Sequence, residues 1–210
     1  MSDQEKNNDE YVMVVSAADL WHAGYFEGLC FDIGKYLTII EEKKNISFNK
    51  RQEMENDHRY KQIIPYVILS HKGTIFSYRR GKLLGEERLL GNYSIGVGGH
   101  ISTYDRNLFD ATYKEAMRRE INEEVEIAST YKEYTAAFLN DDSNDVGRVH
   151  FGMVHMLCLE NPNVKPREKS INEAAFVGQS YLLKNIQKYE NWSQICIRNI
   201  EQLLELCNKS

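Results

Sequence analysis

Three acidic side chains with helical spacing follow a pair of glycines near the middle of the chain. Glu120, Glu123 and Glu124 lie at i, i+3 and i+4, behind Gly98 and Gly99. Residues three and four positions apart are neighbours on a helix, so we expect these carboxylates to gather. Partly buried like charges cost stability unless something positive joins them. Because hard cations such as Mg²⁺ take oxygen ligands, the spacing favours a metal site over a solvated acidic helix face.

The helix that must position these glutamates is predicted over residues 111–125. Its apolar stripe, at about 100° per residue, consists of Tyr113, Met117, Ile121 and Val125. The glutamates lie beside this stripe and not opposite it, which places them partly out of solvent. Asp110 is a suitable N-cap residue and is expected to begin the helix.

The rest of the sequence predicts the α+β class. Residues 66–70 and 74–79 are expected to form a β-hairpin with Lys72-Gly73 at its tip. Further strands are expected over residues 11–15, 92–96, 134–139, 148–159 and 174–177, and helices over residues 181–189 and 193–206. Residues 21–40, rich in aromatics and glycine, are expected to form short strands and turns. The predicted result is a mixed sheet with the carboxylate-bearing helix against it.

Composition narrows the class of protein. The chain has 210 residues, of which 42 % are hydrophobic, and a net charge of −5. The negative charge argues against extended nucleic-acid binding, which needs a basic surface. The N-terminus lacks the pattern of a signal peptide, and no apolar run approaches the length of a membrane helix, so a cytoplasmic location is expected. The four cysteines form no CxxC pair and are expected to be reduced thiols.

The order of these elements resembles the Nudix hydrolase family, with a variant of its motif. The family signature is GX5EX7REUXEEXGU, where U is aliphatic. Residues 119–124 match the REUXEE core at every specified position, and Gly98-Gly99 resembles the glycine pair that opens the motif. The resemblance covers roughly residues 64–189 and implies the α/β/α sandwich of that family with a mixed β-sheet. We therefore expect a hydrolase domain over residues 61–210 and an N-terminal extension over residues 1–60, with dimerisation or a lid as its role.

The chain departs from the signature in three places. Twenty positions separate Gly99 from Arg119 where the signature has fourteen, which implies a six-residue insertion around residues 101–107. The first signature glutamate falls on Ala111, and Glu126 stands where the last glycine is expected. The rim of the pocket is thus where this chain is expected to differ from its relatives.

The resemblance implies hydrolysis of a nucleoside diphosphate linked to another group, with Mg²⁺ or Mn²⁺. Carried over by position, Glu123, Glu124 and the Gly99 carbonyl would bind metal. Glu120 would bind metal or orient and deprotonate the attacking water. Arg119 would hold Glu123 or its neighbours by a charge-assisted bond. The expected partner is a small phosphorylated substrate, and a homodimer is considered.

Other polar residues have two interpretations each. Arg79, Arg80 and Arg88 precede the motif and are expected to grip phosphates, the alternative being solvated surface arginines. His100 follows the glycines and is taken as a substrate contact. Glu168 or Glu173 would supply a further carboxylate by the resemblance. His150 and His155 lie five apart on one predicted strand, so they point to opposite faces and cannot both line one site.

Two other functions are compatible with the motif. A non-catalytic Nudix-like nucleotide-binding or regulatory module would explain the departures at Ala111 and Glu126, although the three core glutamates are kept. An isomerase on the same fold would need an active-site cysteine, for which Cys158 is the candidate. Metal-dependent turnover of nucleoside diphosphate derivatives distinguishes the hydrolase from both.

Overall fold

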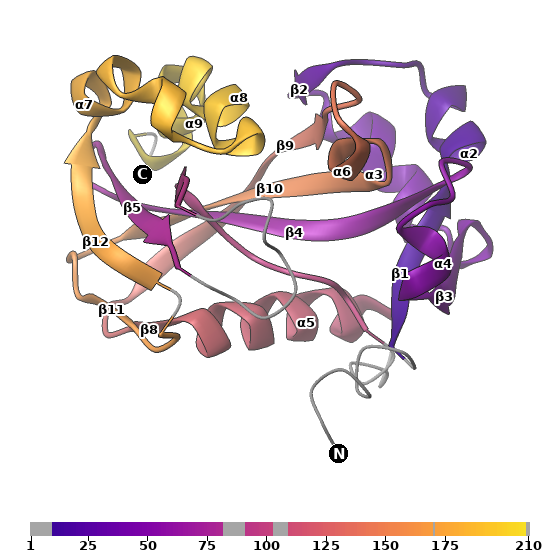
Figure 1. Ribbon diagram of the computed structural model, residues 1–210, viewed down its shortest axis with the longest axis horizontal. Coiled ribbons are helices and arrows are strands. Elements are labelled where there is room, and N and C mark those ends of the chain that lie inside the picture. The colour runs from indigo at the N-terminus through magenta and orange to yellow at the C-terminus, as the bar shows by residue number, and fades with distance from the viewer. Residues whose placement is uncertain (1–9, 82–90, 103–108, 170, 209–210) are drawn as a thin grey trace. The chain divides into compact units, whose positions relative to one another are not determined.

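The helix with the three glutamates forms where the apolar stripe predicts it. A computed structural model of the chain describes residues 10–81, 91–102, 109–169 and 171–208 (Figure 1), and its helix α5 spans Phe109–Glu124. Met117, Ile121 and Val125 are each at most 5 % exposed. Since the helix begins at Phe109, Asp110 lies inside its first turn and is not the N-cap, so that prediction was wrong. Most of the predicted insertion lies outside the described residues.

The chain divides into two units by the grouping of its contacts. The first unit comprises Met1–Pro65, Gly99–Arg118 and Ala137–Met153, and the second comprises Tyr66–Gly98, Arg119–Ala136 and Val154–Ser210. Four elements pass from one unit into the other: α5, β4 (Tyr60–His71), β9 (Tyr131–Asn140) and β10 (His150–Leu159). The strand β4 is longer than predicted and continues through Pro65. The predicted α+β class with a mixed sheet is confirmed.

The strands of the first unit pair around β1 (Tyr11–Ser16). That strand runs antiparallel to β3 (Ile46–Lys50) on one side and to the start of β4 on the other. The short strand β2 (Gly28–Cys30) pairs with the end of β9. The helical segments of this unit are α2 (Ala17–His22), α3 (Ile33–Glu41), η1 (Lys43–Asn45), α4 (Arg51–Met54) and α6 (Asp145–Arg148).

The prediction of short strands and turns over residues 21–40 was right for β2 and the segments beside it and wrong for the other half of the region. That half is helical, mainly in α3, which buries Tyr36 and Ile40 one helical turn apart. These side chains belong to an aromatic core in which Phe26, Tyr36 and Phe151 have ring centroids 5.1–6.0 Å apart. Burial of such large rings is a major source of stability, and it outweighs the weak local preference of the segment.

A buried ion pair holds the α6 loop of the first unit. The Lys61 side chain is 3 % exposed, and its Nζ donates to Asp142 Oδ1 at 2.6 Å and to the Gly147 carbonyl at 3.0 Å. Burial lowers the pKa of Lys61, while its charge helps to lower the pKa of Asp142. Asp141 in the same loop is 2 % exposed and accepts hydrogen bonds from Ser143 and Asn144.

The second unit is organised on the predicted β-hairpin. Strand β5 (Thr74–Arg80) runs antiparallel to the end of β4, and Lys72 and Gly73 at the tip both have positive φ, as a tight two-residue turn requires. β12 (Ile171–Gly178) pairs with β5 along its length. The short strands β6 (Tyr93–Ser94) and β7 (Gly96–Val97) pair with β5 and β4. β8 (Val125–Ile127) follows α5 directly and pairs with β11 (Val164–Pro166).

The C-terminal helices close the second unit and are shown in orange and yellow in Figure 1. They are α7 (Gln179–Lys184), η4 (Ile186–Lys188), α8 (Asn191–Arg198) and α9 (Ile200–Asn208). Glu190 caps α8, and its carboxylate also accepts from the buried Tyr66 hydroxyl at 2.8 Å. Among the described residues, no helix is both long and apolar enough to cross a membrane.

Cys158 and Cys207 form a disulfide that ties β10 to α9. The expectation of four reduced cysteines was therefore wrong for these two, because pairing needs proximity in the fold and not proximity in sequence. Cys30 and Cys196 are free thiols. The bonded Cys158 is not available as the nucleophile of an isomerase.

We predict that Gly147→Ala destabilises the protein. A Cβ at Gly147 would lie 1.8 Å from the Asp141 carbonyl oxygen, so the loop that receives Lys61 must shift. Overpacking against backbone should lower the free energy of unfolding by about 2 kcal/mol or more in urea denaturation. Gly34→Ala is the control, because nothing lies within 4 Å of its added Cβ and it stands in helix α3. It should raise stability by about 0.5–1 kcal/mol. Equal effects of the two substitutions would contradict the geometry.

Candidate functional site

The candidate site lies in the second unit, where β5 faces the end of α5. Successive side chains of a strand point to opposite faces, so Tyr78 and Arg80 share one face and Arg79 lies on the other. The Tyr78 hydroxyl, on a side chain 2 % exposed, donates to the Gly96 carbonyl at 2.8 Å and lies 3.3 Å from Glu124 Oε2. Tyr78 therefore ties the last residue of α5 to β7.

Glu124 is the most strongly perturbed carboxyl group of this site. Burial is the main cause that raises its pKa, to about 8, and the negative charges of Glu168 and Glu120 raise it further. The charge of Arg80 and the hydrogen bond from Tyr78 act in the opposite direction and do not offset the burial. In the metal-free protein at neutral pH, Glu124 is thus largely protonated.

Arg119 bridges the other two glutamates of the helix. Its Nη1 lies 2.8 Å from Glu120 Oε1 and 3.3 Å from Glu123 Oε1. The side chain of Glu120 is 15 % exposed, whereas that of Glu123 is 58 % exposed. Glu120 and Glu124 therefore face inward, and Glu123 lies on the solvent side of the same helical turn.

The two further candidate carboxylates have different surroundings. The backbone N–H groups of Arg167 and Glu168 donate to the Glu124 carbonyl at 2.9 and 3.3 Å, so Glu168 stands at the end of α5. Glu173 has φ of +49° and pairs with Arg79 at 3.0 Å and with the Tyr93 hydroxyl. The geometry thus gathers Glu168, and not Glu173, with the glutamates of the helix.

This donor set suits a hard divalent cation. The carboxyl groups of Glu120 and Glu168 are close enough to Glu124 for their negative charges to raise its pKa. Like charges held together in a partly buried place cost free energy that a bound cation offsets. Carboxylate oxygens are also the ligands that Mg²⁺ and Mn²⁺ prefer.

The predicted phosphate-binding arginines border a surface pocket of about 450 Å³. It is lined by Arg79, Arg80, Gly81, Gly91, Asn172 and Glu173. The Arg80 Nε is buried and has no hydrogen-bond partner among the described residues. Arg79 is engaged by Glu173. Arg88 lies outside the described residues.

Gly99 and His100 belong to the first unit. His100 Nε2 lies 3.1 Å from His150 Nε2, and the side chain of Glu55 is the third member of this group. Burial holds the pKa of His100 well below its ordinary value, with further lowering by the charges of Arg51 and His150. His155 belongs to the second unit, where its Nδ1 lies 4.0 Å from Glu133 Oε1.

Sequence reasoning missed Tyr78, Glu55 and His150 as neighbours of candidate site residues. The sequence could have predicted Tyr78 as a site residue, because it lies two positions before Arg80 on a strand and therefore shares the face of Arg80. Glu55 had none, because its neighbours in sequence are a run of charged residues. The pairing of His150 with His100 depends on contacts between segments 50 residues apart.

The chain is similar to proteins of known sequence and structure. No family model matches the chain. Protein YmaB of Bacillus subtilis (strain 168) is 32 % identical over 205 residues, which cover 92 % of this chain and 98 % of YmaB. The crystal structure of Tm1382, provisionally named a Nudix hydrolase, is 25 % identical with a TM-score of 0.76, covering 96 % of this chain and 100 % of Tm1382.

A more distant structure shares the fold alone. The NUDIX domain of Shewanella oneidensis NrtR, solved with ADP ribose bound, is 11 % identical with a TM-score of 0.52. The likeness covers 70 % of this chain and 88 % of that one.

We predict that Glu124→Gln removes a pH-dependent loss of stability from the metal-free protein. Because the folded-state pKa is raised, the stability linked to this group is complete below the unfolded-state pKa of about 4.3 and is lost as the pH rises through about 8. Glutamine imitates the neutral form at every pH. In urea denaturation with a chelator, the variant should gain about 1–2 kcal/mol on the wild type between about pH 6 and pH 9, after allowance for screening by solvent.

The control for this experiment is Glu126→Gln, two residues further on and 50 % exposed. It should follow the wild type across the same pH range. A constant offset between Glu124→Gln and the wild type would contradict the raised pKa.

Proposed function

The chain belongs to the Nudix hydrolase family, and we propose that it is a metal-dependent hydrolase that cleaves a pyrophosphate bond in a nucleoside diphosphate linked to another group. The observation that carries this proposal is the gathering of Glu120, Glu124 and Glu168 beside Tyr78 and Arg80. A pyrophosphate repels any nucleophile by its own negative charge, so its cleavage needs both positive charge and a base. This site can provide both.

The metal would be Mg²⁺ or Mn²⁺, held by Glu120, Glu123, Glu124 and the Gly99 carbonyl, with Glu168 as a further carboxylate. When bound, the ion supplies charge neutralisation and lowers the pKa of water. Tyr78 orients the Glu124 carboxyl group through its hydrogen bond. Arg119 holds Glu120 and Glu123 in fixed rotamers. Glu120, the more buried of these two, would either bind the ion or orient the attacking water and accept its proton.

Arg80 would bind the substrate's phosphates. Its buried Nε lacks a partner among the described residues, and a phosphate oxygen is a suitable acceptor. Arg79 is the second candidate, although substrate binding would have to displace Glu173 from it. Arg88 is a further proposed substrate contact, and His100 can serve as one only while its ring binds no metal ion. The bound ADP ribose of the NrtR domain supports a nucleoside diphosphate derivative as the substrate class.

The organisation of the chain forms part of this proposal. Residues 61–210 would be the hydrolase domain, and residues 1–60 an N-terminal extension that serves as a dimer interface or covers the substrate. We also propose a cytoplasmic location. The family assignment and the retained glutamates support the hydrolase over a purely regulatory module.

We predict that the protein hydrolyses one or more members of a panel of nucleoside diphosphate derivatives with Mg²⁺ or Mn²⁺. The measured product is nucleoside monophosphate. Glu120→Gln should lower kcat by about 10²-fold or more, because the base is lost. Glu126→Gln is the matched control on an exposed glutamate near the same helix end and should retain the wild-type rate. Failure of every substrate, or equal activity of the two variants, would overturn the proposal.

Removal of the metal gives an independent prediction. Dialysis against a chelator should abolish turnover while the far-UV circular dichroism spectrum stays unchanged, and added Mg²⁺ should restore it. Full activity in the chelator would contradict the role given to the glutamates. Tight nucleotide binding without turnover in either condition would point instead to a regulatory module.

A further inference from the structure

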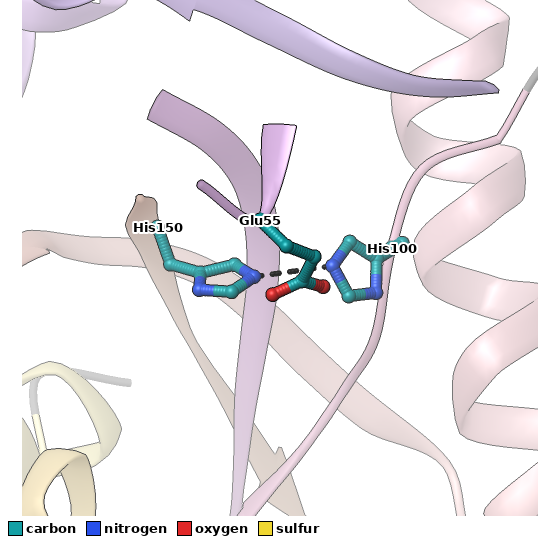
Figure 2. A group of neighbouring side chains, drawn as sticks. All are labelled: Glu55, His100 and His150. Carbon is teal, nitrogen blue, oxygen red and sulfur yellow. Dashed lines mark hydrogen bonds between the residues drawn. The ribbon is translucent and has the colours of Figure 1, made fainter. Parts of the chain in front are cut away.

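Three side chains with metal-binding chemistry meet in the first unit, outside the glutamates of α5. Glu55, His100 and His150 each offer one ligand atom, and these atoms lie within 4.8 Å of one another. Figure 2 shows the two imidazole rings pointing toward each other with the Glu55 carboxylate beside the line that joins them. None of the three is a neighbour of another in sequence.

We infer that Glu55, His100 and His150 form a binding site for a divalent transition-metal ion, with Zn²⁺ as its representative. Two imidazoles and one carboxylate are a ligand set that Zn²⁺ accepts, with the fourth position left to water. Nitrogen ligands distinguish this site from the all-oxygen set of the glutamates, which suits Mg²⁺. The two sites would therefore take different ions.

The distance between the imidazoles fits a shared ion. The two Nε2 atoms lie 3.1 Å apart. Zinc–nitrogen bonds of about 2.0–2.1 Å with angles between octahedral and tetrahedral place two ligands about 2.9–3.4 Å apart. An ion could thus bind both nitrogens from beside the line that joins them, with His100 carrying its hydrogen on Nδ1, once both rings tilt toward it.

The second nitrogen of His150 is already held in the manner of a metal ligand. His150 Nδ1 lies 2.6 Å from the Val146 carbonyl, and a carbonyl only accepts, so Nδ1 carries the hydrogen. In the neutral ring, Nε2 then has a lone pair directed at His100. A ligand histidine whose other nitrogen donates to a backbone carbonyl is the usual arrangement around bound metals.

The charges around Glu55 permit a cation. Arg51 lies 3.3 Å from Glu55 Oε1 and 2.9 Å from Glu10 Oε2, so its positive charge is shared between two carboxylates. Glu55 has a second oxygen for another partner. The Glu55 side chain is 31 % exposed, which gives an ion a path from solvent.

The three ligands come from separate, well-anchored segments. The Glu55 N–H donates to the Arg51 carbonyl and ends α4. His100 precedes Ile101, which is fully buried and whose carbonyl accepts from Met13 at 2.8 Å. His150 begins β10. A bound ion would join these segments and stabilise the folded unit by mass action.

The test uses the untagged full-length protein, stripped with a chelator and titrated with Zn²⁺ in excess Mg²⁺, which saturates the carboxylate site. We expect one Zn²⁺ per chain with micromolar or tighter affinity, and a rise in Tm on binding. Glu55→Gln and His150→Gln should each weaken binding by about tenfold or more, in the range found for changes around metal ligands. Co²⁺ in place of Zn²⁺ should give a visible d–d spectrum that both variants lose.

Two controls separate loss of a ligand from loss of folding. Glu53→Gln changes an exposed glutamate on the same short helix, and His58→Gln changes an exposed histidine nearby. Both should bind Zn²⁺ like the wild type. The His150→Gln variant is at risk of misfolding because His150 is buried. The Glu55→Gln variant changes a partly exposed ligand and therefore tests the site independently. Circular dichroism checks the fold of each variant. No saturable Zn²⁺ binding by the wild type, or unchanged binding by a folded Glu55→Gln variant, would overturn the inference.

Discussion

The main constraint on the candidate site is the free-energy cost of holding several carboxyl groups close together and out of water. Glu124 ends α5, where the helix already presents negative partial charge, and Glu120 and Glu168 add their own. Burial and these neighbouring charges raise the pKa of Glu124 to about 8, so in the metal-free protein this group is largely protonated at neutral pH. A cation at the proposed site would have to displace this proton, so its affinity would depend on pH.

The surrounding structure holds this electrostatic arrangement in place. Tyr78 connects the end of α5 with the Gly96 carbonyl, and the hairpin that carries Tyr78 also directs Arg80 to the same face. In the first unit, an aromatic core around Tyr36 and Phe151 supports the segments that bring His100 to His150. Each unit thus uses ordinary apolar packing to hold polar groups at positions that they would not occupy on their own.

Sequence reasoning was most successful where the signal was local. The stripe of α5 and the Lys72-Gly73 turn depend on residues a few positions apart, and both are found. Reasoning failed over residues 33–40, where local preferences are weak and the helix α3 forms by packing against the core. It also failed for Cys158 and Cys207, which lie 49 residues apart and meet only in the folded second unit.

The sequence by itself determined the family motif, the α+β class and the three glutamates on one turn of a helix, because a helix converts spacing directly into proximity. Only the tertiary structure decided which carboxyl group is buried, that Glu168 and not Glu173 joins the helix end, and that Glu55, His100 and His150 meet. Burial and long-range neighbours arise from packing of segments far apart in the chain. They control the pKa values and the ligand sets, and so the chemistry that the motif can perform.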